Sequence, residues 1–123
     1  MTANRFIGEV DAPEFGDGFT IRLDMNGQAK LEAEHGEFEF LGKVYTGLVV
    51  LSAKYITSFL SVALRDANGA VVGDVPAFSV PIEVVGRKCL DAFCLCRYGK
   101  DNETWVASNE KAKKANPSKA TKA

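Results

Sequence analysis

The stretch from residue 52 to residue 68 constrains the fold most, because it has the pattern of an amphipathic helix with a signal at each end. Ser52 can cap the first turn, and Asn68 followed by Gly69 can close the last turn. Between these ends, large apolar residues recur every three or four positions, which is the spacing of one helix face. That face consists of Tyr55, Ile56, Phe59, Leu60, Ala63 and Leu64. Such a stripe must be covered by the rest of the domain or by a partner.

A second amphipathic helix is predicted from Pro81 to Tyr98. Proline suits the first turn of a helix, and Gly99 lies just beyond the expected end. Gly86 is a weak point inside it, because glycine has a low helix propensity. The apolar stripe of this helix consists of Ile82, Val85, Cys89, Ala92, Phe93 and Cys96.

Two extended segments near the N-terminus predict a β-hairpin. The first runs from Arg5 to Asp11, and the second, from Phe19 to Asp24, alternates apolar and polar residues with a period of two. The glycines of residues 13–18 supply the positive φ angles that a reversal needs. Two strands alone are marginally stable in water, so the hairpin must pack on helices.

The segment between the hairpin and the first amphipathic helix predicts further helices. Gln28 to His35 is rich in helix formers, with Asp24 or Asn26 as the cap and Gly36 at the end. Residues 37–50 begin with a strand-like alternation and continue as an apolar stretch. Helix and strand compete there, and a helix from about Leu41 is favoured.

These elements predict a single α+β domain over residues 1–100, in which the hairpin packs on a small bundle of three or four helices. Beyond residue 100 the apolar periodicity stops, apart from Trp105 and Val106. Residues 101–123 are therefore predicted to be a flexible basic tail, disordered from Asn109 onward. Residues 109–123 carry five lysines and one glutamate, a charge of +4, which leaves −5 for the rest of a chain whose net charge is −1.

The three cysteines, Cys89, Cys94 and Cys96, have the spacing C-x4-C-x-C. This spacing lacks the paired C-x-x-C arms of a zinc site. On a helix, Cys89 and Cys96 would lie roughly 10 Å apart, beyond the reach of a disulfide. We interpret all three as buried core thiols, and a metal or redox role is the alternative.

Other candidates for chemistry are few. His35 is the only histidine, and we interpret it as a group that interacts with the C-terminal end of its helix, because no nucleophile motif accompanies it. No phosphate-binding loop is present. The acidic cluster indicates a solvated edge, with a contact patch for a basic partner as the alternative; it consists of Glu32, Glu34, Glu37 and Glu39. We therefore expect no enzyme activity, no metal and no cofactor.

The expected location is the cytoplasm. The longest apolar run, Gly47 to Leu51, is far too short to cross a bilayer, and the first residues do not resemble a signal peptide. The lysine-rich tail could touch nucleic acid weakly, but no aromatic residue follows Trp105 to stack on bases. Neither a membrane nor a specific nucleic acid is an expected partner.

The residues expected to matter most lie on the two amphipathic stripes. They form either the core or a partner-binding groove, and the sequence does not decide between the two. They are Phe59, Leu60, Leu64, Ile82, Val85 and Phe93.

The order of short motifs over roughly residues 4 to 69 resembles a family of tailed-phage proteins. An early strand is followed by a second strand with an Arg-Leu pair, a turn of small residues, a helix that closes on glycine, and an apolar helix that ends in Leu-Arg. The matching residues are Gly8-Glu9-Val10, Arg22-Leu23, Asn26-Gly27, Ala29, Leu31-Glu32 and Gly36, then Phe59 to Leu64, Arg65 and Gly69. The family is that of the small tail assembly chaperones of the gene transfer agent type, also labelled phage tail tube proteins.

This resemblance implies a non-enzymatic bacteriophage or prophage protein in the cytoplasm of the bacterial host. Such a chaperone would bind the tape measure protein and assist assembly of the tail tube protein around it. The alternative is a structural tail component, of the tail tube or tube-terminator type, that is retained in the virion. Self-association of the chain is left open.

Overall fold

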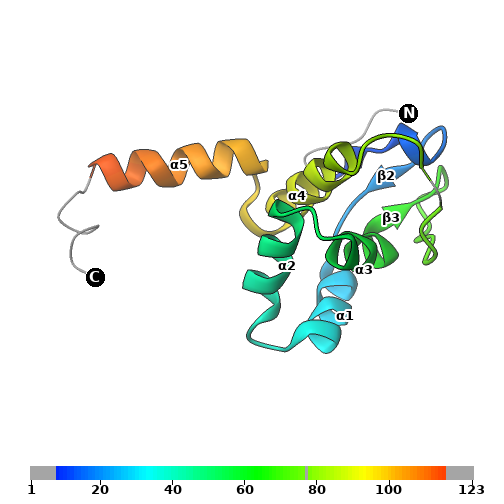
Figure 1. Ribbon diagram of the computed structural model, residues 1–123, viewed down its shortest axis with the longest axis horizontal. Helices are drawn as coiled ribbons and strands as arrows, with labels where there is room; N and C mark the ends of the chain where they lie inside the picture. The colour runs from blue at the N-terminus through cyan, green and yellow to red at the C-terminus, as the bar shows by residue number, and fades with distance from the viewer. Residues whose placement is uncertain (1–7, 77, 116–123) are drawn as a thin grey trace.

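A computed structural model describes residues 8–76 and 78–115 and has an α+β architecture (Figure 1). Three short strands, β1 (Val10–Asp11), β2 (Thr20–Ile21) and β3 (Leu64–Arg65), form an antiparallel sheet in that order. Val10 pairs with Ile21, and Ile21 pairs with Leu64 on the other side. The predicted hairpin is therefore confirmed, and a third strand from much later in the chain is added to it.

Helices make up most of the rest of the described structure. In the described residues they are α1 (Met25–His35), α2 (Phe40–Val49), α3 (Ala53–Ala63), α4 (Ile82–Tyr98) and α5 (Asn102–Ala115), with a 3₁₀ helix at Pro13–Phe15. The first four pack together and α4 contacts β1 and β2, whereas α5 projects away from the body (Figure 1). The helices predicted after Asp24, from about Leu41 and near Pro81 to Tyr98 are confirmed, within a few residues at their ends.

The helix predicted to end at Asn68 is shorter than expected, since α3 stops at Ala63. The chain then extends as β3 and pairs with β2. This pairing satisfies backbone groups of β2 that would lack partners on that side if α3 continued as a helix. Arg22 N donates to the carbonyl oxygen of Ala63 at 2.9 Å. Gly69, with φ of +83°, closes a turn in the loop after β3 instead of a helix.

The predicted flexible tail differs from the structure over residues 102–115, which form α5. The Asp101 carboxylate accepts a hydrogen bond from Thr104 N at 2.8 Å, which caps the first turn. Trp105 stacks on Tyr98 at a centroid distance of 4.6 Å, so the start of α5 is held by packing as well. The rest of the predicted tail, residues 116–123, lies outside the described residues.

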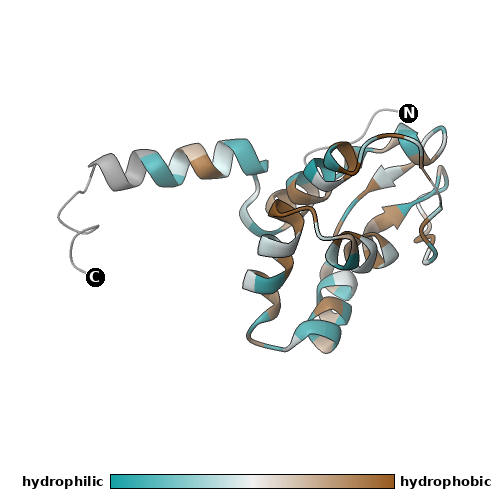
Figure 2. Cartoon of the chain, viewed as in Figure 1, coloured by the Kyte–Doolittle hydropathy of each residue, from teal (hydrophilic) through white to brown (hydrophobic). Residues whose placement is uncertain are grey.

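The hydrophobic core includes buried residues of α2, α3 and α4 and of the sheet. Phe59 of α3 and Phe93 of α4 are fully buried, with ring centroids 6.4 Å apart. Ile21 brings the central strand into the same cluster. Hydropathy colouring shows hydrophobic residues concentrated on α2, α3 and α4 and sparse on α5 (Figure 2).

Within the part of the chain that the structure describes, no single helix is long and apolar enough to cross a membrane. The pair α2 and α3 would meet the length and composition criteria together, but their axes are bent by 113°.

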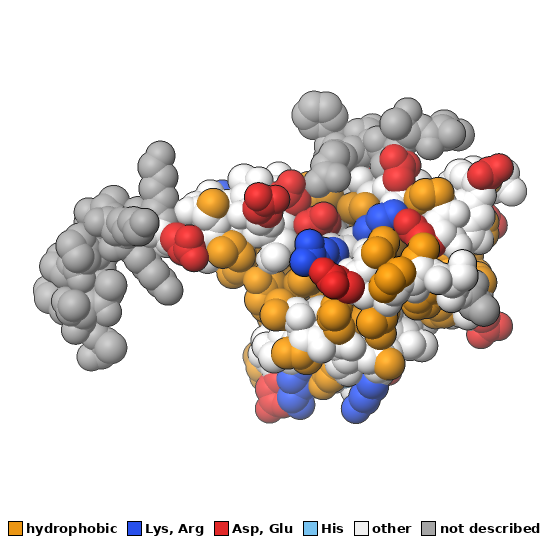
Figure 3. All heavy atoms as spheres, turned by 45° about the horizontal axis from the view of Figure 1, so that its top comes forward, with side chains coloured by type: hydrophobic (Ala, Val, Ile, Leu, Met, Phe, Trp, Pro, Cys, Tyr) orange, Lys and Arg blue, Asp and Glu red, His pale blue; other side chains and the backbone are white. Residues whose placement is uncertain are grey.

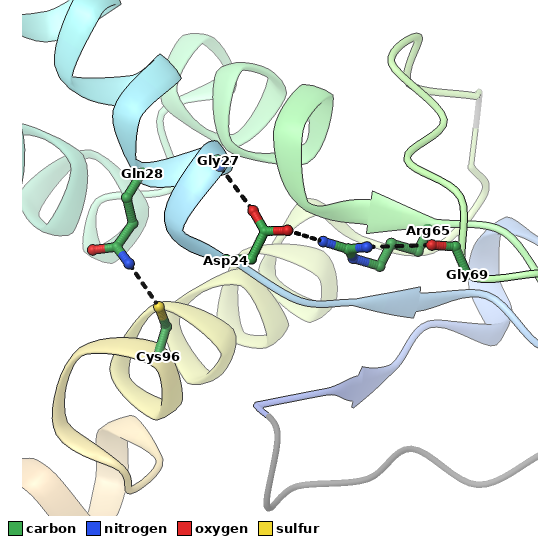
Figure 4. A network of polar contacts seen from close by, with 6 residues as sticks. All are labelled: Asp24, Gly27, Gln28, Arg65, Gly69 and Cys96. Atoms are coloured by element: carbon green, nitrogen blue, oxygen red, sulfur yellow. Dashed lines mark hydrogen bonds and ion pairs between the residues drawn. The ribbon is translucent and has the colours of Figure 1, made fainter.

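Asp24 joins the start of α1 to the third strand (Figure 4). One carboxylate oxygen accepts from Gly27 N at 2.8 Å, and the other accepts from Nη2 of Arg65 at 2.7 Å. Arg65 also donates through Nη1 to the carbonyl oxygen of Gly69 at 3.2 Å. The hydrogen bond from Gly27 and then the Arg65 contact hold the pKa of Asp24 below its ordinary value of 3.8, although partial burial opposes them.

This lowered pKa predicts an acid-sensitive contribution to stability. A carboxyl whose pKa is lower in the folded state stabilises the protein above its unfolded-state pKa, and the contribution is lost as the pH falls through the folded-state value. Asp24→Asn keeps an oxygen acceptor for the helix cap but removes the charge. Between about pH 5 and about pH 2, urea unfolding should show a steeper loss of stability for the wild type than for Asp24→Asn. Parallel curves for the two proteins would contradict this role for Asp24.

Candidate docking groove

The structure places five of the six predicted stripe residues in the core. Each of these five has a relative exposure of 1% or less, and they are Phe59, Leu60, Leu64, Val85 and Phe93. Ile82 is different, since it is 38% exposed in the first turn of α4. A surface for a partner must therefore be formed mainly by other residues.

A hollow lies between the end of α2, the first half of α4 and the start of α5. Its volume is about 700 Å³. Its apolar lining consists of Val49, Leu51, Leu90 and Val106. Its polar lining consists of Glu83, Arg87, Asp91, Asn102 and Glu103. We call this feature the α2–α4–α5 groove.

The apolar side of the groove is formed by the corner between α2 and α3. Val49 and Val50 are 48% and 66% exposed, although both are aliphatic. Leu51 has a φ of +59°, which among the described residues is the single positive value outside glycine. A left-handed conformation costs a leucine roughly 1 kcal/mol or more, so the surrounding packing must hold it in place.

Gly86 explains how this corner comes so close to α4. A Cβ atom at Gly86 would lie only 2.4 Å from Cδ2 of Leu51 and 3.3 Å from Cδ1 of Ile56. The glycine that appears as a weak point in the sequence thus makes room for the Leu51 side chain. The left-handed corner and the close helix contact together place Val49 and Leu51 in the lining of the groove.

The rim of the groove is acidic. Glu83, Asp91 and Glu103 carry three negative charges, against the one positive charge of Arg87. Arg87 and Glu83 form an exposed ion pair at 2.6 Å, and this kind of pair contributes little to stability. Figure 3 shows hydrophobic side chains around a cluster of basic and acidic ones on the face in view.

The first turns of α5 are fixed, so the groove is preformed. Tyr45 of α2 donates from its hydroxyl to Oδ1 of Asn102 at 2.9 Å, and its ring meets Trp105 edge-on at 5.6 Å. Asn102 N donates to the Asp91 carboxylate at 3.2 Å. These contacts join the start of α5 to both α2 and α4.

His35 belongs to a polar chain that joins the end of α1 to α3. Its Nε2 lies 2.9 Å from Oγ of Ser58, and that hydroxyl donates to Oε2 of Glu34 at 2.7 Å. Because the hydroxyl has one proton and gives it to Glu34, His35 must donate to Ser58. This order is the reverse of a histidine base that activates a serine. His35 ends α1 as predicted, but it acts by buried hydrogen bonding and by packing on Tyr55, 4.9 Å away.

Cys89 and Cys94 are buried as predicted, whereas Cys96 is only half-buried. Burial raises the pKa of Cys94 to about 12, and burial also raises the pKa values of Cys89 and Cys96. Cys96 Sγ accepts a hydrogen bond from Nε2 of Gln28 at 3.1 Å (Figure 4). A thiol held in this form is neither a ready nucleophile nor a ready metal ligand. In residues 8–76 and 78–115, no three His, Cys, Asp or Glu side chains converge to hold a metal ion.

Comparison with known protein families, with curated proteins and with solved structures finds no match for this chain.

Proposed function

We propose that the chain is a non-enzymatic tail assembly chaperone of a phage or prophage, which works in the bacterial cytoplasm by holding an apolar helix of the tape measure protein. The observation that carries this proposal is the α2–α4–α5 groove, whose lining includes Val49, an aliphatic residue that is 48% exposed. Removing exposed aliphatic side chains from water is favourable, so a partner that covers them gains binding free energy.

The chemistry of the groove favours an amphipathic helix as its occupant. An apolar floor suits the anchor residues that a helix presents every three or four positions. The acidic rim adds a preference for lysine or arginine beside those anchors, and it raises the association rate more than the affinity. A tape measure protein is a long helical chain whose apolar stripes are exposed until the tail tube protein encloses it. Temporary cover for such stripes is a physical reason for a chaperone.

A single substitution at the mouth of the groove tests this mode of binding. Val49→Glu places a charge in the apolar lining of the groove, and we expect affinity for the tape measure protein to fall at least tenfold, as measured by calorimetry. Because Val49 is 48% exposed, the free energy of unfolding should fall by less than about 1 kcal/mol. Met25→Glu is the matched control, since Met25 is 78% exposed but lies on α1. Equal binding by both variants would exclude the groove.

The alternative function is a tail component, of the tail tube or tube-terminator type, that stays in the virion. The same groove could then hold a neighbouring tail protein permanently. Quantitative mass spectrometry of purified particles separates the two proposals. A chaperone is absent from mature tails, whereas a component is present at a fixed number of copies per particle.

A further inference from the structure

We propose that the partner helix in the α2–α4–α5 groove continues along the outer face of α2 to a second anchor, Phe38. The second anchor rests on the proposed function, and it sets the length and the spacing of the segment that the chain binds. Phe38 would thus select for partners that have two apolar anchors about eleven residues apart on one helix.

Phe38 is an aromatic side chain that the fold leaves in water. It lies in the turn between α1 and α2 and is 91% exposed. The turn is held at both ends, because Gly36 N donates to the carbonyl oxygen of Glu32 at 2.9 Å and Phe40 is buried in the core. Aromatic residues supply much of the binding energy at protein interfaces. An exposed phenylalanine on a fixed turn is therefore suited to anchor a partner.

Phe38 continues a line of exposed residues on α2 that ends in the groove. Phe38, Gly42 and Val49 are four and seven positions apart, which is the spacing of one helix face. The helical path extends back into the turn, since Phe40 N donates to the carbonyl oxygen of Gly36 at 3.1 Å. Gly42 and Val49 are exposed, and a Cβ atom at Gly42 would meet nothing within 4 Å. Val49 also lines the groove, so the groove and this face of α2 meet at Val49.

The charges at the two ends of this surface have the same sign. Phe38 lies between Glu37 and Glu39, which are both exposed. Lys43 pairs with Glu39 at 2.7 Å, so the three charged side chains of the turn have a net charge of −1. The rim of the groove is also net negative. A single apolar helix with lysine or arginine beside its anchors suits both ends, and this favours one occupant over two.

The distance between the two ends sets the minimum length of the occupant. Phe38 and Val49 are eleven residues apart, which spans roughly 16 Å at about 1.5 Å per residue of helix. A helix that lies beside α2 therefore needs its two anchors about three turns apart to contact both residues. A shorter helix fills the groove without reaching Phe38. A long helical chain such as the tape measure protein meets this requirement.

Calorimetry with the tape measure protein tests the second anchor. Phe38→Ser should weaken binding about tenfold, because the interface loses an aromatic anchor. Its melting temperature should match that of the wild type, since a side chain this exposed contributes little to folding. Met25→Ser is the matched control, because Met25 is 78% exposed but lies on α1, and this variant should bind as the wild type does. Full affinity in Phe38→Ser would overturn the second anchor, whereas weak binding by Val49→Glu would still support the proposed function.

Cross-linking locates the two anchors on the partner. Benzoylphenylalanine, a photoreactive analogue of phenylalanine, replaces Phe38 in one sample and Val49 in another. We expect both samples to cross-link to the tape measure protein, at positions about eleven residues apart in its sequence, as mapped by mass spectrometry. Cross-links from position 49 alone, or from the two positions to unrelated segments, would overturn the second anchor and leave the groove in use. Cross-links from neither position, although a complex forms, would overturn both the second anchor and the proposed function of the groove.

Discussion

Phe93→Ala is expected to lower the free energy of unfolding by about 3 to 5 kcal/mol, the largest effect among the single substitutions considered. Phe93 is fully buried at the centre of α4, and its ring packs against those of Phe59, at 6.4 Å, and Tyr45, at 6.1 Å. Truncation removes this apolar surface and leaves a cavity that the neighbouring helices α2 and α3 cannot fully close. Urea or thermal unfolding measures the loss.

Ile82→Ala is the control for Phe93→Ala, because both residues belong to the apolar stripe of α4 but only Phe93 lies in the core. Ile82 is 38% exposed, so its truncation should cost less than about 1 kcal/mol. Similar losses for the two variants would contradict the assignment of Phe93 to the core and Ile82 to the surface.

Gly47→Ala is expected to destabilise the protein by about 1 to 3 kcal/mol, although alanine is the better helix former. A Cβ atom at Gly47 would lie 2.4 Å from Cγ and 2.6 Å from Cβ of Tyr55. These atoms are close to the backbone of α3, so the ring cannot move aside without a shift of the helix. Crowding should therefore outweigh the gain in helix propensity.

Gly42→Ala, in the same helix, is the matched control. A Cβ atom at Gly42 would meet nothing within 4 Å, so only the helix propensity changes. The expected result is a gain of about 0.5 to 1 kcal/mol. If Gly47→Ala also stabilised the protein, the close approach of α2 to α3 would be wrong. Equilibrium unfolding of the two variants side by side gives the sign of each effect.

Most elements of the fold could be predicted from the sequence because they are set locally. The alternation around Ile21 marks β2, and the spacing of apolar residues marks α3 and α4. The end of α3 could not be predicted in this way. Leu64 fits the apolar stripe of a continuing helix, but a pairing with Ile21, more than forty residues earlier, draws it into a strand. Non-local pairing of this kind leaves no local signal.

The groove was harder to predict than the fold. The stripes chosen from periodicity are mostly core, since a regular apolar face is what a small domain buries. A weaker signal in the sequence is the run of apolar residues just before Ser52, because they cannot all face inward at a helix corner. They are Val49, Val50 and Leu51. The left-handed backbone of Leu51 and its fit against Gly86 depend on tertiary packing, so no local sequence pattern predicts them.

Hydrogen–deuterium exchange of the chain with and without the tape measure protein tests the central claim most directly. The account predicts slower exchange at the α2–α3 corner around Val50, in the first half of α4 from Glu83 to Asp91, and in the first turns of α5. These three segments are distant in sequence and meet only at the groove. Protection confined to the sheet or to α1, or no protection although a complex forms, would contradict the account.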